Sequence, residues 1–96
     1  MRYFHRTPIP PDAVLQEADA FFGQRMQSTA SETRHRGYRH PAGSVTVDVR
    51  IEGGHYTNIT VATDQVGESE VDKIAKRFLS VVHAKADPAH TVRGAY

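Results

Sequence analysis

The chain has 96 residues, enough for one domain with a single modest core. It carries 12 Lys and Arg residues against 11 Asp and Glu residues, and the formal net charge of +1 excludes a global field that would attract nucleic acid or an anionic membrane. It has no cysteine, which excludes disulfides, thiolate catalysis and thiolate metal sites.

The apolar stretches are too short to span a membrane, and the first eight residues, MRYFHRTP, lack the apolar centre of a secretory signal. We therefore expect a single cytoplasmic domain over residues 1–96, with no membrane partner. Residues 1–9 are predicted to form an N-terminal arm or an edge strand.

A first helix is predicted to begin near Pro11, because proline is tolerated in the first turn and Asp12 suits the positive end of the helix dipole. Gly23 is the expected C-terminal cap. The apolar residues between these ends recur with the helical period and form one stripe: Val14, Leu15, Ala18, Phe21 and Phe22.

Residues 26–40 are polar throughout with weak alternation, and we interpret them as one edge strand. Arg34, Arg36 and Arg39 would supply the charge that discourages association at a sheet edge. Tyr38 lies between these arginines, so the segment is also a candidate site for an anion or RNA, since guanidinium groups bind phosphates and a ring stacks on a base.

Residues 45–52 alternate between apolar and polar side chains, which predicts a strand with one buried face. A second strand follows, with Ile59 facing inward. A three-residue turn at residues 53–55, with a glycine in the left-handed conformation, pairs Val49 with Ile59, whereas a two-residue turn mixes apolar and polar residues on both faces. The inward residues are then Val45, Val47, Val49, Ile51, Ile59 and Val61.

The last helix has an apolar stripe and both end signals. Ser69 resembles an N-cap with Asp72 three residues later, and Asp72 and Lys76 suit an i,i+4 pair on the outer side. Asp87-Pro88 ends the helix, and residues 87–96 are expected to be a mobile tail. The stripe consists of Val71, Ile74, Ala75, Phe78, Leu79 and Val82.

These elements predict a two-layer α+β fold in the order (β)-α-β-β-β-α, in which both helices pack on one face of an antiparallel meander of three or four strands. The edge at residues 57–63 is expected to be free for a second copy. The open face is the candidate surface for a ligand or partner, although a solvated sheet face requires similar residues. That face carries Asp48, Arg50, Glu52, Tyr56, Asn58 and Thr60.

The sequence indicates no cofactor and no metal site, because the six histidines show none of the spacings of a helical metal pair. No serine lies in a nucleophile elbow. An enzyme would have to use Asp48, Arg50, Glu52 and Tyr56, and a carboxylate on an open sheet face has no apolar pocket to raise its pKa.

The order of elements, the turn at residues 40–43 and Lys73-Ile74-Ala75-Lys76 are together similar to a double-stranded-RNA-binding domain. That family reads the shape of A-form RNA with its first helix, a strand loop and lysines at the start of its second helix. Here Glu68, Glu70 and Asp72 occupy that first turn and would repel phosphates.

We therefore expect a small non-enzymatic association or ligand-binding domain that forms a homodimer. Its partner would be a second copy, another protein or a small molecule bound on the open sheet face. The alternatives are binding of RNA or another polyanion through residues 34–40, and a small enzyme that uses the polar sheet face.

Overall fold

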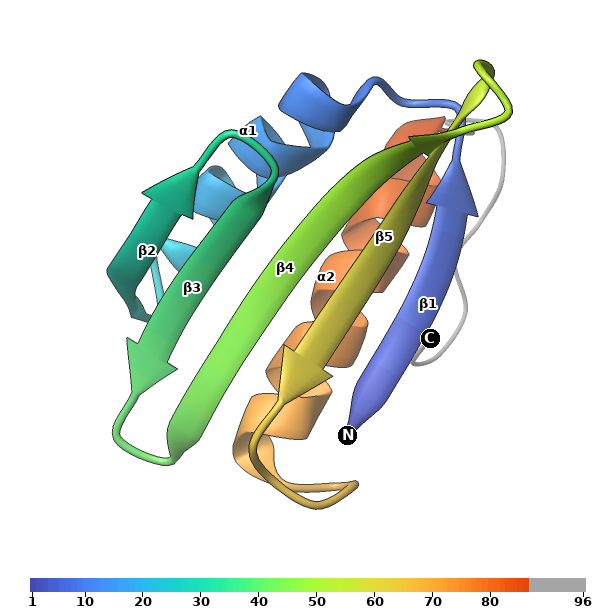
Figure 1. Ribbon diagram of the computed structural model, residues 1–96. Coiled ribbons are helices and arrows are strands. Elements are labelled where there is room, and N and C mark those ends of the chain that lie inside the picture. The colour runs from blue at the N-terminus through green and yellow to red at the C-terminus, as the bar shows by residue number, and fades with distance from the viewer. Residues whose placement is uncertain (87–96) are drawn as a thin grey trace.

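The computed structural model describes residues 1–86 as a layer of five strands backed by a layer of two helices (Figure 1). Every pair of neighbouring strands is antiparallel, in the order β1-β5-β4-β3-β2. The predicted α+β class with both helices on one face is confirmed. The elements are β1 (Arg2–Thr7), α1 (Pro11–Phe22), β2 (Gln27–Glu32), β3 (His35–His40), β4 (Gly43–Glu52), β5 (Tyr56–Thr63) and α2 (Glu70–Ala86).

The sheet has five strands rather than the predicted three or four, because residues 26–40 form a hairpin and not one edge strand. The turn is Thr33-Arg34, between the paired residues Glu32 and His35. β2 is exposed along nearly its whole length, so the segment lacks the apolar alternation that would mark two strands. β3 is therefore an interior strand, and β2 is the edge.

The pairing of β4 with β5 confirms the predicted register, with Val49 opposite Ile59. The connecting turn consists of Gly53, Gly54 and His55, as predicted. Both glycines adopt the left-handed conformation, with φ of 64° and 75°. This conformation costs other L-residues about 1–2 kcal/mol, which explains why two glycines stand here.

The N-terminal edge strand is also present, because β1 pairs with β5 along its whole length, with Phe4 opposite Thr60. It occupies the edge of residues 57–63 that the sequence suggested would be free for a second copy. That prediction is wrong. Within residues 1–86 the outer edges of the sheet belong to β1 and β2.

The core lies between the sheet and the helices. α1 packs on β3 and β4, and α2 packs on β1, β4 and β5. The predicted apolar stripes of both helices are buried, except that Ile74 is partly exposed. Gly23 is the C-cap of α1, as predicted, with a helical φ of −60° and its backbone N–H donating to the Asp19 carbonyl oxygen at 2.9 Å.

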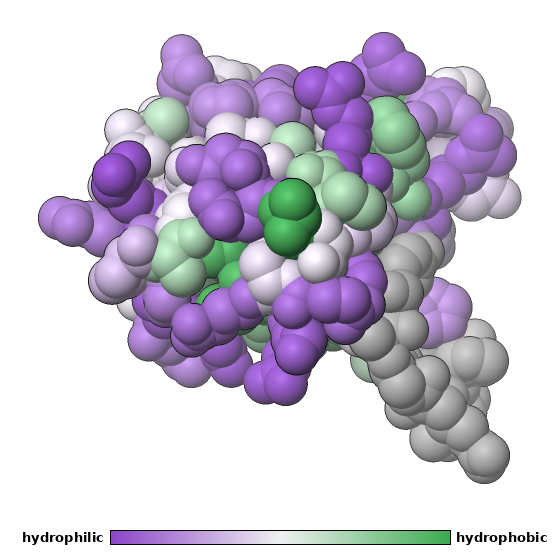
Figure 2. Space-filling view, turned by 90° about the horizontal axis from the view of Figure 1, so that it is seen from below, coloured by the Kyte–Doolittle hydropathy of each residue, from purple (hydrophilic) through white to green (hydrophobic). Residues whose placement is uncertain are grey.

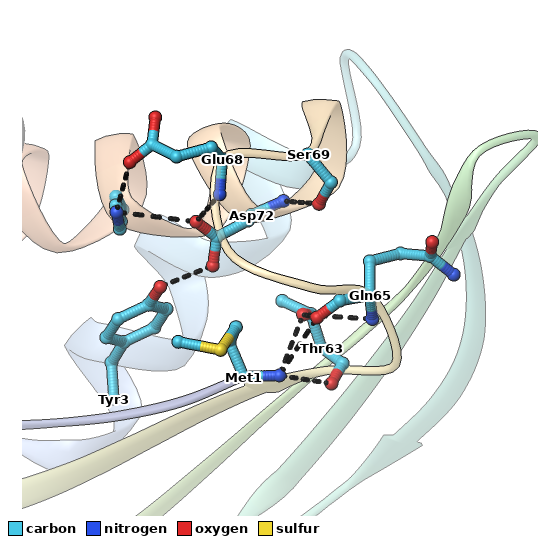
Figure 3. A network of polar contacts seen from close by, with 8 residues as sticks. Met1, Tyr3, Thr63, Gln65, Glu68, Ser69 and Asp72 are labelled. Atoms are coloured by element: carbon cyan, nitrogen blue, oxygen red, sulfur yellow. Dashed lines mark hydrogen bonds and ion pairs between the residues drawn. The ribbon is translucent and has the colours of Figure 1, made fainter.

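The start of α2 is fixed by a small polar network (Figure 3). Ser69 Oγ accepts a hydrogen bond of 3.1 Å from the backbone N–H of Asp72, as the predicted N-cap requires. The Asp72 side chain is fully buried and not on the outer side, although its ion pair with Lys76 is present at 3.4 Å. The predicted helix end at Asp87-Pro88 and the predicted tail lie outside the described residues.

Candidate functional site

The face of the sheet opposite the helices is uncovered within residues 1–86 (Figure 1), and we call it the outer face. All six residues predicted for an open sheet face lie on it, since they alternate with the core residues of β4 and β5. The outer face also receives side chains from β1 and β3. These are Arg2, Phe4 and Arg6 of β1, and His35 and Arg39 of β3.

Asp48 lies in a row of paired residues that crosses four strands. Its Oδ1 is 2.6 Å from Nδ1 of His35, its partner on β3. On its other side the row continues through Thr60 to Phe4. The Asp48 carboxylate is therefore held at the β3 side, away from Phe4.

Glu52 is engaged by two neighbours on the outer face. Asn58 Nδ2 donates a hydrogen bond of 2.6 Å to Glu52 Oε2, and Arg6 forms an ion pair with the same carboxylate. The hydrogen bond from Asn58 lowers the pKa of Glu52 most strongly, and the charge of Arg6 lowers it further. Glu52 is thus kept ionised, which is the opposite of what a general acid requires.

A shallow hollow of about 260 Å³ lies where β1, β5 and β4 meet on this face. The Phe4 ring stands at its side and is 64% exposed. The guanidinium groups of Arg2 and Arg50 also line it, and neither forms an ion pair or hydrogen bond with another side chain in the described residues. The remaining lining comes from Asp48, Val49, Asn58 and Thr60.

The chemistry of this hollow follows from those groups. Two guanidinium groups that have no side-chain partner in the described part of the chain attract an anion such as a carboxylate or phosphate. An exposed ring beside them offers a flat apolar surface on which a planar group can stack. The hollow therefore suits a ligand that combines negative charge with a ring.

The basic segment predicted as an anion or RNA site does not form one surface. Tyr38 is buried, with its ring stacked on Phe22 at 4.7 Å between centroids, and its hydroxyl donates to Asp19 at 2.7 Å. Burial raises the pKa of Tyr38, and the hydrogen bond to Asp19 raises it further. Because Tyr38 faces the helices, it cannot stack on a base, and this part of the prediction is wrong.

The three arginines of that segment point in different directions. Arg36 lies on the helix side of β3, 3.2 Å from the Asp19 carboxylate, because its partner on β4 is the core residue Val47. Arg34 lies in the β2–β3 turn, 3.8 Å from Asp12 of α1. Arg39 alone reaches the outer face. The three arginines are close in the sequence, but strand alternation and the hairpin turn place them on different sides of the domain.

Arg2, Phe4 and Arg6 were missed as site residues. Their signal is present in the sequence, since they alternate with Tyr3, His5 and Thr7 in the way that a strand with one exposed face requires. What the sequence does not give is the position of β1. Only its pairing with β5 brings Phe4 beside Thr60 and the arginine of β4.

The end of the domain that carries the β3–β4 turn and the loop before α2 is covered mostly by hydrophilic side chains (Figure 2). Two large apolar side chains are exposed at this end, Val66 at 76% and Met1 at 50%. Single exposed apolar residues are normal on protein surfaces, and the rest of this end is mostly hydrophilic. The outer face is therefore the stronger candidate surface.

No cluster of three or more metal-ligating side chains occurs within residues 1–86. Neither helix in the same residues is long and apolar enough to cross a membrane. No protein-family model matches the chain, and no curated protein matches it.

Proposed function

We propose that this protein is a non-enzymatic binding domain whose outer sheet face receives an anionic ligand that carries a planar ring. The observation behind the proposal is the hollow lined by Phe4, Arg2 and Arg50, in which two cationic groups have no ion-pair or hydrogen-bond partner among the side chains of residues 1–86, beside an exposed ring. A ring would stack on Phe4 while its anionic group meets the guanidinium groups.

Catalysis on this face is less well supported than binding. The Glu52 carboxylate is committed to Arg6 and Asn58, and Asp48 is committed to His35. The hollow between them is too shallow to exclude water from a reacting group. Recognition needs only the charges and the ring, which the face supplies.

A nucleoside monophosphate combines both features and is the probe of choice, measured by calorimetry at low salt. We expect weak binding that falls roughly tenfold or more in Arg50→Gln, because a hydrogen bond to a charged group contributes about 1.5–3 kcal/mol. Arg77→Gln is the matched control, since Arg77 is exposed on α2 in the opposite layer. Equal losses in the two variants, or no binding by the unaltered chain, would refute the proposal.

Self-association is a second candidate, and one observation favours it. The edge strand β2 carries no charged side chain over residues 27–31, whereas the opposite edge strand β1 carries Arg2 and Arg6. An unpaired edge without charge is a template for pairing with another strand. Two copies joined through β2 would form one continuous sheet.

Sedimentation at increasing concentration tests this dimer. Ser31→Lys places a charge in the edge and is expected to shift the equilibrium to monomer, while Gln16→Lys on the exposed side of α1 should leave it unchanged. A chain that stays strictly monomeric at high concentration would rule the dimer out.

A further inference from the structure

We infer that the outer face binds single-stranded nucleic acid, with two non-adjacent bases of the same strand stacked on Phe4 and Tyr56. This inference rests on the proposed function and names the class of ligand. It is carried by the alignment of rings and guanidinium groups along β1 and β5.

The two exposed rings of the outer face lie in line. Phe4 is opposite Thr60, and Tyr56 lies four residues further along β5, where it is 46% exposed. Four residues of an extended strand correspond to about 13 Å. Two exposed rings at this separation can each stack on a different base of one polymer, whereas a single small ligand reaches only one of them.

Guanidinium groups accompany both rings. Arg2 and Arg6 flank Phe4 on β1, and Arg50 lies in the same cross-strand row as Arg6. The Arg6 guanidinium also lies over the Tyr56 ring, 5.5 Å from its centroid. Because Arg6 is paired with Glu52, Arg2 and Arg50 are the cations expected to meet phosphates, while the bases meet the rings.

The two carboxylates of the same face do not oppose this arrangement. Asp48 is paired with His35 and Glu52 is paired with Arg6 and Asn58, so both carboxylates are offset locally. Arg2 and Arg50 form no ion pair within residues 1–86 and are the cations proposed to meet phosphates, although the charge of Arg50 also acts on Glu52. Because the net charge of the chain is only +1, we expect moderate affinity that requires low salt.

The shape of the surface favours a single strand over a duplex. Bases of a double helix are stacked on one another and cannot reach exposed rings, whereas unpaired bases can be splayed onto a sheet. The hollow beside Phe4 is open and shallow, as an extended chain needs. An enclosed pocket would instead favour one small molecule.

Fluorescence anisotropy tests the inference on the full chain. The ligands are a labelled single strand of about eight nucleotides, a duplex of the same sequence, and the mononucleotide as competitor. We expect the single strand to bind more tightly than the duplex and the mononucleotide. Phe4→Ala and Tyr56→Ala should each weaken binding roughly tenfold, and Arg50→Gln should lower the salt slope by about one. Val66→Ala and Arg77→Gln are the controls, as exposed residues outside the outer face.

The outcomes separate this inference from the proposed function. If the mononucleotide binds but the oligonucleotide binds no better and Tyr56→Ala has no effect, the inference fails and the proposed function stands. If neither binds, both fail. Preference for the duplex would overturn the inference, as would a dimer that Phe4→Ala converts to monomer in a chain that binds no oligonucleotide.

Discussion

Replacing Phe22 with alanine is expected to lower the free energy of unfolding by about 3–5 kcal/mol. Phe22 is fully buried where α1, α2 and β3 meet, and its ring contacts those of Tyr38 at 4.7 Å and Phe78 at 5.1 Å. Alanine would remove these contacts and leave a cavity that rigid neighbours cannot fill. Since small domains are stable by only about 5–15 kcal/mol, the variant should be close to unfolding.

Urea denaturation followed by circular dichroism measures this loss. Phe4→Ala is the matched control, because Phe4 is 64% exposed and its removal should change stability by no more than about 0.5 kcal/mol. A Phe22→Ala variant within about 1 kcal/mol of the unaltered chain would contradict the described core. The same control shows whether Phe4 can be changed in binding experiments without loss of the fold.

Replacing Asp72 with alanine is expected to cost about 3 kcal/mol, because it breaks a buried ion pair. The Asp72 carboxylate accepts hydrogen bonds from the Tyr3 hydroxyl and, at 2.9 Å, from the backbone N–H of Glu68 (Figure 3). It also pairs with Lys76 at 3.4 Å. These contacts join β1 to α2, and they support Glu68 in its left-handed conformation, with φ of 68°.

The same network makes part of the stability depend on pH. Burial raises the pKa of Asp72. The hydrogen bonds from Tyr3 and Glu68 and the interaction with Lys76 together lower it by more, so the pKa of Asp72 lies below its ordinary value of 3.8. A lowered pKa means that the unfolded chain takes up the proton first. The stabilisation is therefore complete at neutral pH and is lost as the pH falls through the pKa of the folded state.

Unfolding measured from neutral pH to about pH 3 tests this effect. Asp72→Asn keeps an acceptor but cannot ionise, so its stability should fall less steeply in acid than that of the unaltered chain. Glu32→Gln is the control and should leave the slope unchanged, because Glu32 is exposed on β2 and its side chain forms no ion pair within residues 1–86. If the stability of Asp72→Asn and of the unaltered chain fell in parallel with decreasing pH, ionisation of Asp72 would not be a source of the pH dependence.

Where one face of an element is apolar, the sequence predicted most of its buried residues, although Ile51, predicted to face inward, is 59% exposed. The alternation of residues 45–52 and the two glycines after them were enough to derive the register of β4 and β5. The helices followed from their apolar stripes. In each case burial of one face leaves a single acceptable arrangement.

Residues 26–40 could not be divided in the same way. Polar residues of this segment lie on both faces of the sheet, so no apolar alternation marks the strands. The turn at Thr33-Arg34 contains none of the glycine, asparagine or proline that marks a turn. Tyr38 looked like a surface aromatic among arginines. Its burial depends on pairing with the core residue Val45, a contact that only the assembled sheet creates.

The sequence predicted the residues of the candidate site on two of its strands but not those on the third. Its β4 and β5 residues followed from alternation within the hairpin, but its β1 residues required knowledge of which strand β1 joins. Parallel or antiparallel addition at either sheet edge was compatible with the short sequence of residues 2–7. The prediction that Asp72 lies on the outer side of the helix was wrong, because a buried carboxylate is rare and depends on partners that are distant in the chain, here Tyr3.

An amide NMR titration with a nucleoside monophosphate shows directly whether the outer face is the binding surface. We expect shifts concentrated in β1, in residues 48–52 of β4 and in residues 56–60 of β5, with α1 and α2 nearly unchanged. Shifts confined to the helices, or none at saturating ligand, would contradict this expectation.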